Sequence, residues 1–365
     1  MQNDVVLVIV VATALAFDFT NGFHDTANVV ATSISTRAMP PRLAVGYAAA
    51  LNFAGAFISL AVAATVAQDV VNAGAITPTV VFAGLIGAIS WNLITWYFGL
   101  PSSSSHALIG GVVGAAFAAA GPSAVLGAGI VGKVLIPAVI APIVAFIVGA
   151  IAIVVCYRVV GRVRPGHAGR GYRLGQVVSG GLLALAHGTN DAQKTMGVIT
   201  LALIANGNLA ADSNPPTWVI VTAASAIALG TYFGGWRIIR TVGTRIIKMD
   251  PAQGFSASGA GAAVILASSH FGFPLSTTQV ISGGVMGAGA AKRVSAVRWG
   301  VAGNIVVAWL LTMPAAAMIG AVTYGITRIF GTGAAGPIVV AATGLAMVAA
   351  AFTKRVRVGS PVPAP

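Results

Sequence analysis

Two polar segments of this chain are each repeated later in the chain, and all four copies lie within otherwise apolar sequence. The segment NGFHDTAN at residues 21–28 recurs as HGTNDAQK at residues 187–194. The segment FGLPSSSSH at residues 98–106 recurs as FGFPLSTTQ at residues 271–279, and a Gly-Gly pair follows both copies. A polar site that is duplicated inside hydrophobic sequence is typical of secondary transporters built from two structural repeats.

The composition restricts the class of protein. Hydrophobic residues make up 57% of the chain and charged residues only 7%, whereas soluble domains carry about 25% charged residues. The apolar runs reach the ~20 residues that a membrane-spanning helix needs, and the 46 glycines favour close helix packing in lipid. No basic stretch precedes the first apolar run, so we expect a retained helix there instead of a cleaved signal. These features predict an all-α polytopic membrane protein.

The apolar runs predict two sets of about five membrane elements and one further helix. They lie at residues 5–35 (interrupted), 43–67, 80–99, 101–120, 134–158, 175–206 (interrupted), 217–236, 254–272, 275–291, 299–323 and 336–353. We expect a first repeat at 1–160, a cytoplasmic basic linker at 161–174, a second repeat at 175–325, and a C-terminal transmembrane helix with a basic tail at 326–365.

The basic residues predict the orientation of these elements. The net charge of +13 could indicate nucleic-acid binding, but the basic residues lie mainly in short connections between apolar runs. If the N-terminus is outside and each element crosses once, every lysine and arginine except Lys133, Lys194 and Arg328 falls in a cytoplasmic connection or in the C-terminal tail. This distribution follows the positive-inside rule. We therefore expect a plasma (inner) membrane protein with a cytoplasmic C-terminus and no nucleic-acid partner.

An odd number of crossings in each repeat has a further consequence. The second repeat then enters the membrane from the opposite side, so the two are expected to be inverted repeats. The proline- and serine-rich openings of residues 101–120 and 275–291 leave a second possibility, in which these segments are re-entrant hairpins and not full crossings.

Polar residues at helical spacing form a matching stripe in each copy of the first motif. The stripes are Asp18, Asn21, Asp25 and Asn28 in the first copy, and His187, Asn190, Asp191 and Lys194 in the second. Ionisable residues inside membrane segments are costly unless they are paired, and they usually mark function. Gly22 and Gly188 occupy equivalent positions, where we expect the helices to break and free carbonyl groups for a ligand.

The oxygen ligands of these stripes favour a hard cation such as Na⁺, or a transferable proton. The candidate ligands are Asn21, Asp25, Asn28, Asn190 and Asp191. His24 is expected to point away from Asp25, because adjacent residues lie on different sides of a helix. A buried, hydrogen-bonded histidine and a proton relay remain equally open for it. We expect no bound organic cofactor.

The second motif predicts an anion site. Pro101 and Pro274 each precede a run of hydroxyl residues that opens a glycine-rich helix. Helix N-termini with free backbone N–H groups attract oxyanions, and ordinary capping accounts for only one or two hydroxyls per helix. The candidate anion ligands are Ser103, Ser104, Ser105, Ser276, Thr277 and Thr278, with Lys194, Asp25 and Asp191 beside them.

Residues 21–28, 101–111, 187–197, 274–284 and 297–314 resemble the PiT family of inorganic phosphate transporters. The resemblance implies inverted repeats, a homodimer, and symport of phosphate with Na⁺ or H⁺. It also implies that a metal–phosphate complex could be the substrate, as in some bacterial members. Because the chain lacks the long central hydrophilic loop of eukaryotic members, and has His24 where many of them have asparagine, it is similar to short prokaryotic members.

The expected function is therefore cation-coupled import of inorganic phosphate by alternating access. Three alternatives remain open. The first is a permease for sulfate or another oxyanion on the same fold. The second is an anion channel, which is disfavoured because a channel does not need buried carboxylates on the anion path. An intramembrane enzyme with a Ser–His dyad at His106 is disfavoured, because the second copy of the motif has Gln279 at that position.

Overall fold

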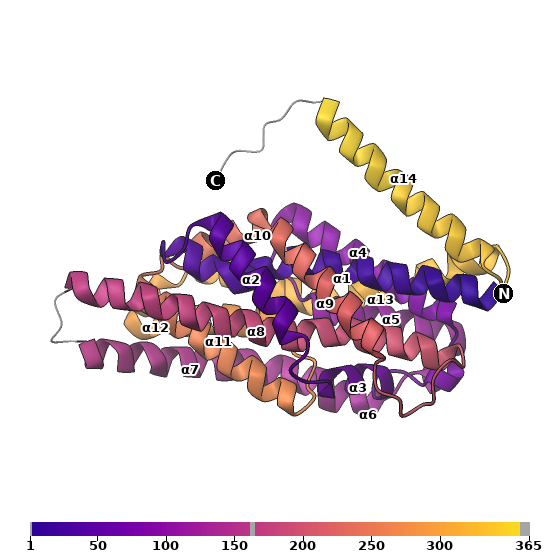
Figure 1. Cartoon of the computed structure of the whole chain (residues 1–365), viewed down its shortest axis with the longest axis horizontal. Helices are drawn as coiled ribbons and strands as arrows, with labels where there is room; N and C mark the ends of the chain where they lie inside the picture. The colour runs from indigo at the N-terminus through magenta and orange to yellow at the C-terminus, as the bar shows by residue number, and fades with distance from the viewer. Residues whose placement is uncertain (1, 161–164, 358–365) are drawn as a thin grey trace.

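The computed structural model describes residues 2–160 and 165–357, and within these ranges the chain is a bundle of helices that run mainly along one long axis (Figure 1). Four of the described helices are long and apolar enough to cross a membrane, and one bent helix pair would make a fifth. The four are Asp4–Ser35, Pro78–Phe98, Gly127–Val160 and Trp299–Ile329, and the pair is Thr217–Phe233 with Trp236–Arg245. The chain is a multi-pass, all-helical membrane protein, as its composition predicts.

The helices occur in the same order in the two halves of the chain. The first half contains α1 (Gln2–Ser35), α2 (Pro41–Gly55), α3 (Ala61–Gln68), α4 (Pro78–Phe98), α5 (Ser104–Ala120), α6 (Gly127–Gly129) and α7 (Ile136–Val160). The second half contains α8 (Pro165–Ala205), α9 (Thr217–Phe233), α10 (Trp236–Arg240), α11 (Pro251–His270), α12 (Thr277–Lys292) and α13 (Trp299–Ile329), and α14 (Ala335–Arg357) follows. Each half is a long helix, a broken helix, a helical hairpin and a second long helix with an internal proline. Residues 161–164 of the expected linker lie outside the described residues, and 165–174 form the first turns of α8.

The two helices that carry the polar stripes are unbroken, so the predicted breaks at Gly22 and Gly188 are wrong. Both glycines instead allow another helix to approach closely. A Cβ atom on Gly22 would lie 2.3 Å from the Ile227 carbonyl oxygen of α9, and one on Gly188 would lie 2.1 Å from the Asn52 carbonyl oxygen of α2. The repeated glycine therefore reflects backbone-to-backbone packing, which small residues permit inside a membrane.

The breaks occur instead in the element after each long helix. The expected element 43–67 is two helices, α2 and α3, and the expected element 217–236 continues at an angle of 60° into the helix that begins at Trp236. The Gln193 side-chain oxygen of α8 accepts hydrogen bonds from the backbone N–H groups of Val62 and Ala63, at 2.9 and 3.2 Å. A break at membrane depth is tolerated where neighbouring side chains satisfy the freed backbone groups in this way.

Helices α4 and α5 form one hairpin, and α11 and α12 form another. At the open end of the first hairpin, an isolated β-bridge between Val71 and Val125 connects the loop that precedes α4 to the loop that follows α5. The open end of the second is held by a 2.9 Å ion pair between Asp250 and Lys292. At the two tips, the Ser105 hydroxyl of one hairpin donates a 3.0 Å hydrogen bond to the Leu275 carbonyl oxygen of the other. The hairpins thus extend from opposite ends of the bundle and meet in its interior (Figure 1).

Each half packs mainly against the other half. Helix α1 lies along α9, and its counterpart α8 lies along α2. Helix α13 packs on the hairpin of the first half, and α7 packs on the hairpin of the second. The buried apolar residues form two clusters, one centred on α4 and α5 and the other on α11 and α12. The apolar residues of the paired motifs contribute to both clusters, Ala192 to the first and Ala27 and Leu275 to the second.

Candidate functional site

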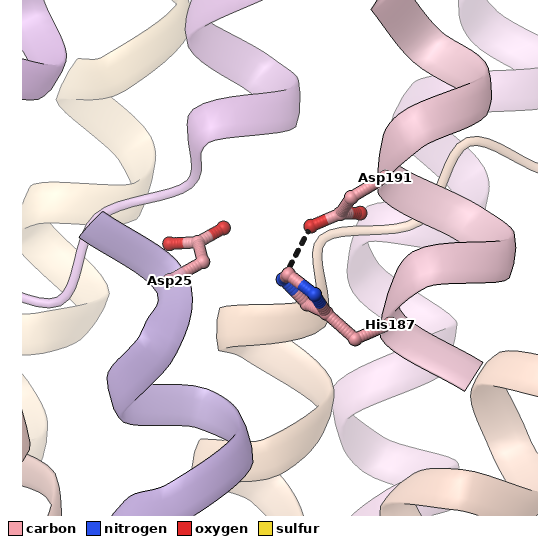
Figure 2. Close-up of side chains that lie close together, drawn as sticks. All are labelled: Asp25, His187 and Asp191. Carbon is pink, nitrogen blue, oxygen red and sulfur yellow. Dashed lines mark ion pairs between the residues drawn. The ribbon is translucent and has the colours of Figure 1, made fainter. Parts of the chain in front are cut away.

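The aspartates of the two polar stripes face one another in the interior of the bundle. Asp25 of α1 and Asp191 of α8 are at most 1% exposed. One ligand atom from each of them and one from His187 lie within 4.8 Å of one another, an arrangement that could hold a cation. Figure 2 shows His187 and Asp191 projecting from α8 toward Asp25 on α1. The second aspartate of the first stripe, Asp18, is not in this group.

The Asp25 carboxylate is hydrogen-bonded from three directions. The Ser104 hydroxyl donates to one oxygen at 2.5 Å. The other oxygen lies 2.6 Å from Nδ1 of His24 and 3.4 Å from the Thr278 hydroxyl. The expectation that His24 points away from Asp25 is therefore wrong, because its imidazole ring reaches the neighbouring carboxylate with one nitrogen while the other nitrogen lies 3.2 Å from the Thr95 hydroxyl.

The Asp191 carboxylate has a corresponding set of partners in the second half. One oxygen accepts a hydrogen bond from the Lys194 ammonium group. The other lies 2.9 Å from Nε2 of His187 and accepts a 3.1 Å hydrogen bond from the Thr277 hydroxyl. Thr277 is the counterpart of Ser104 in the repeated motif. In both halves, therefore, the equivalent hydroxyl group of the hairpin tip, that of Ser104 or Thr277, donates to the aspartate of the same half.

The next hydroxyl in each tip contacts the opposite half. The Lys194 ammonium group lies 2.5 Å from the Ser105 hydroxyl and 2.6 Å from the Leu275 carbonyl oxygen. Asn28, which is the counterpart of Lys194, donates from its amide to the Thr278 hydroxyl at 2.8 Å. The four motif copies thus form one buried polar cluster, which we call the central cluster: Asp25, Asn28, Ser104, Ser105, His187, Asp191, Lys194, Thr277 and Thr278.

Ser103 and Ser276 cap the helices that the hairpin tips open. The Ser103 hydroxyl oxygen accepts a 3.1 Å hydrogen bond from the backbone N–H of His106, and Ser276 accepts one of 3.3 Å from the backbone N–H of Gln279. The first backbone N–H groups of a helix have no partner within the helix. At both tips these groups belong to residues of the hydroxyl runs, so the tips combine polar hydrogens with the positive ends of two helix dipoles.

Two predicted cation ligands have other surroundings. The Asn190 amide nitrogen donates to the Ser269 hydroxyl at 2.8 Å and to the Phe273 carbonyl oxygen at 3.1 Å, so it supports the α11–α12 tip. The Asn21 side-chain oxygen is buried without a hydrogen-bond partner among the described residues. Conversely, His187 was not among the predicted ligands. Its spacing of four residues from Asp191 on a helix, which puts both on one face, was the available signal.

A multi-pass helical bundle with paired, buried, ionisable side chains at its centre is the architecture of a secondary transporter. The chain belongs to the phosphate transporter family, which it matches over residues 21–320. It is therefore a transporter and not an enzyme. The matched region contains both copies of both polar motifs.

Curated relatives cover most of the chain. It is 56% identical over 326 residues to a probable low-affinity inorganic phosphate transporter of Mycobacterium tuberculosis (strain ATCC 25618 / H37Rv), a match that covers 89% of this chain and 78% of the relative. A protein of the same description from Bacillus subtilis (strain 168) is 45% identical over 323 residues, which are 88% of this chain and 96% of the relative.

The fold is also similar to a solved structure described as a sodium-dependent phosphate transporter. The TM-score is 0.80, with coverage of 89% of this chain and 99% of the other. At 22% sequence identity the likeness concerns the fold.

Proposed function

We propose that this protein imports inorganic phosphate across the plasma membrane together with Na⁺ or H⁺, by alternating access to the central cluster. One observation carries the proposal. Two carboxylates from equivalent positions in the two halves are bonded to hydroxyl groups from two hairpin tips, all of them buried in one place. The descriptions of the relatives and of the structural neighbour, which name phosphate and sodium, support the substrate and the cation.

The hydrogen bonds suggest how cation and anion binding are coupled. A hydroxyl group has one proton to donate, and Ser104 donates to Asp25 while Thr277 donates to Asp191. When a cation or proton occupies the carboxylates, the hydroxyl protons become available to an oxyanion at the same tips. The backbone N–H groups of these two helix N-termini that Ser103 and Ser276 do not cap add further donors. Cation binding therefore prepares the anion site.

Electrostatic repulsion gives the same order of events. Phosphate carries one to two negative charges near neutral pH, and the site already contains two carboxylates and only one lysine. Like charges a few ångströms apart in a poorly solvated site repel strongly. Phosphate therefore binds well only after the carboxylates are neutralised, and by linkage each ligand raises the affinity for the other by the same factor.

The same proposal includes the membrane arrangement. The halves act as inverted repeats with α4–α5 and α11–α12 as re-entrant hairpins, the N-terminus outside and the C-terminus cytoplasmic. The repeated order of helices and the interleaved packing of the halves support this arrangement. The distribution of basic residues fits re-entrant hairpins as well as it fits full crossings, because neither hairpin tip carries a lysine or arginine. The homodimer implied by the family resemblance stays a prediction.

Uptake by purified protein in liposomes tests the proposal. Labelled phosphate should accumulate against its gradient when an inward Na⁺ gradient or an inward pH gradient is imposed, and it should not accumulate when both are absent. Excess sulfate should compete weakly. Strong competition by sulfate would instead favour the alternative of a sulfate permease. Adding Mg²⁺ tests whether a metal–phosphate complex is the preferred substrate. If neither cation gradient drives accumulation, coupled symport is wrong.

A further inference from the structure

One buried carboxylate is not part of the central cluster. Asp18 lies on α1, two helical turns before Asp25 and on the same face, at a distance of ~10 Å along the axis from the rise of 1.5 Å per residue. Its side chain is fully buried. Neither of its carboxylate oxygens has a hydrogen-bond partner in the part of the chain that the structure describes. Asp18 therefore differs from Asp25 and Asp191, each of which has three polar partners.

Other unpartnered polar groups accompany Asp18. The Thr195 hydroxyl of α8 lies beside the Asp18 carboxylate, but neither group completes a hydrogen bond with the other or with another described residue. The Asn21 side-chain oxygen, one turn away on α1, is also unpartnered within the described ranges. The charged groups that act on Asp18 are Asp191 and Lys194 of α8. Helices α4 and α9, which also pack against α1, contain no Asp, Glu, Lys, Arg or His.

These surroundings determine which form of the Asp18 side chain is stable. An ionised carboxylate that is removed from water without a hydrogen bond or a direct counter-ion is strongly destabilised. Such a group avoids this destabilisation by binding a cation or a proton. A buried carboxylate that no fixed partner satisfies is therefore expected to hold an exchangeable positive charge.

The local structure favours a proton over a metal cation. Hard cations such as Ca²⁺ take about six or more oxygen ligands, and backbone carbonyls supply many of these where a membrane helix is broken. Helix α1 is unbroken beside Asp18, so its carbonyl groups are engaged within the helix. The positive charge of Lys194 also acts on this position and opposes a second metal cation. A proton requires only the carboxylate itself.

We propose that Asp18 is a proton-binding site that takes part in coupling and is separate from the central cluster. The inference rests on the proposed function of phosphate symport. Asp18 lies between the central cluster and the end of α1 that carries the N-terminus, which the proposed topology places outside. A proton bound there removes a negative charge near Asp191 before phosphate enters, and its release on the cytoplasmic side returns the site to its starting form.

The first experiment compares the wild type, Asp18→Asn and the control Asp212→Asn in liposomes. Asp212 lies in an exposed turn, and both substitutions preserve the shape of the side chain while removing its charge. Phosphate uptake at low substrate and a pH-sensitive dye inside the vesicles report transport and co-transported protons. Wild type and Asp212→Asn should lose up to about tenfold in uptake per unit of rising external pH, as expected for one linked proton. Asp18→Asn should be nearly independent of pH and should carry fewer protons per phosphate.

The outcomes separate the inference from the function on which it rests. If the wild type takes up no phosphate, the proposed function is wrong. If the wild type transports phosphate but Asp18→Asn keeps its pH dependence and proton ratio, only the assignment of Asp18 is wrong. A variant that keeps the pH dependence but needs a higher Na⁺ concentration would identify a Na⁺ site, and it would also overturn the proton assignment.

A second experiment does not depend on the folding of a variant. Dicyclohexylcarbodiimide is apolar and reacts with protonated carboxyl groups, so it can report a buried acid in the wild-type protein. Mass spectrometry should find Asp18 modified, more strongly at pH 6 than at pH 8, with Asp191 protected by its ion pair with Lys194. If Asp18 remains unmodified at both pH values while a carboxyl group elsewhere in the bundle reacts, the proposal is contradicted.

Discussion

At the scale of single residues, the two central carboxylates should both be indispensable for transport. Their removal should have unequal effects on thermal stability. Asp25→Asn and Asp191→Asn each remove a negative charge that a cation must neutralise, so each should abolish accumulation of phosphate in liposomes. Asp191→Asn should also lower the thermal stability, because it leaves the buried Lys194 ammonium group without its counter-ion. Near-normal accumulation by either variant would remove that aspartate from the cation site.

The hydroxyl groups of the two hairpin tips provide a second prediction at this scale. Ser104→Ala or Thr277→Ala removes one donor to a charged group, which is worth roughly 1.5–3 kcal/mol. At 1.4 kcal/mol per tenfold, phosphate affinity should fall by about one to two orders of magnitude. Ser123→Ala, which removes an exposed hydroxyl at the end of the bundle, should leave the affinity unchanged. Affinity and melting temperature should be measured on the same samples, since a pure loss of stability would indicate that the tip hydroxyls have only a structural role.

At the scale of elements, Asp250 connects the two ends of the α11–α12 hairpin. It accepts the backbone N–H of Gln253 at 2.8 Å in a capping box, and it pairs with Lys292 and with the Tyr157 hydroxyl, each at 2.9 Å. Burial raises the pKa of the Asp250 carboxyl, but the hydrogen bonds from Lys292, Gln253 and Tyr157 outweigh it and hold the pKa below its usual value.

This depressed pKa predicts how stability depends on pH. A group whose pKa is lower in the folded state contributes stability above its unfolded pKa of about 3.9, and that stability is lost as the pH falls through the folded pKa. The melting temperature of the wild type should therefore drop as the pH is lowered below about 5, and part of that drop should be missing in Asp250→Asn. The variant should already be less stable at pH 7. Parallel curves for the two proteins would show that Asp250 does not titrate in this range.

The close packing of α8 on α2 gives another prediction for elements. Gly188→Ala would place a methyl group 2.1 Å from the Asn52 carbonyl oxygen, and overpacking of this kind costs about 1–3 kcal/mol. Gly303→Ala on α13 is the matched control, since a Cβ atom there would meet nothing within 4 Å and alanine favours the helix. Gly188→Ala should lower the melting temperature and Gly303→Ala should not. Equal effects would mean that the helices are not in contact at this position.

At the scale of the whole molecule, the orientation of the halves can be measured directly. In a background where the buried Cys156 is replaced by serine, single cysteines should be placed at Gly166, Thr244 and Ala211, which are exposed at ends of the bundle. A membrane-impermeant maleimide should label Ala211→Cys in intact cells, and should label the other two only after the membrane is opened. Labelling of Gly166→Cys and Ala211→Cys from the same side would contradict inverted repeats.

The sequence alone determined the class of this protein and predicted the chemistry of its site. Its hydrophobic composition required a membrane, and its basic residues predicted one orientation. The duplicated motifs by themselves identified both aspartates and both hydroxyl runs. The membrane class is confirmed because it depends only on the transfer of residues between water and lipid. The orientation and the ligand-binding residues stay predictions. None of these inferences depends on which helix lies beside which.

Only the tertiary structure decided how these residues meet. The charge distribution cannot distinguish two crossings from a hairpin, because residues 99–103 and 271–276 contain no basic residue. Gly22 and Gly188 predicted breaks in the long helices, but they proved to be points of contact with other helices. The sequence could not separate the two cases, because both a helix bend and a close neighbouring helix favour glycine. His187 joined the central cluster and Asp18 was left outside it, although both belong to the predicted stripes. Sequence spacing fixes which face of a helix a residue occupies, and only the packing of the two halves fixes what that face meets.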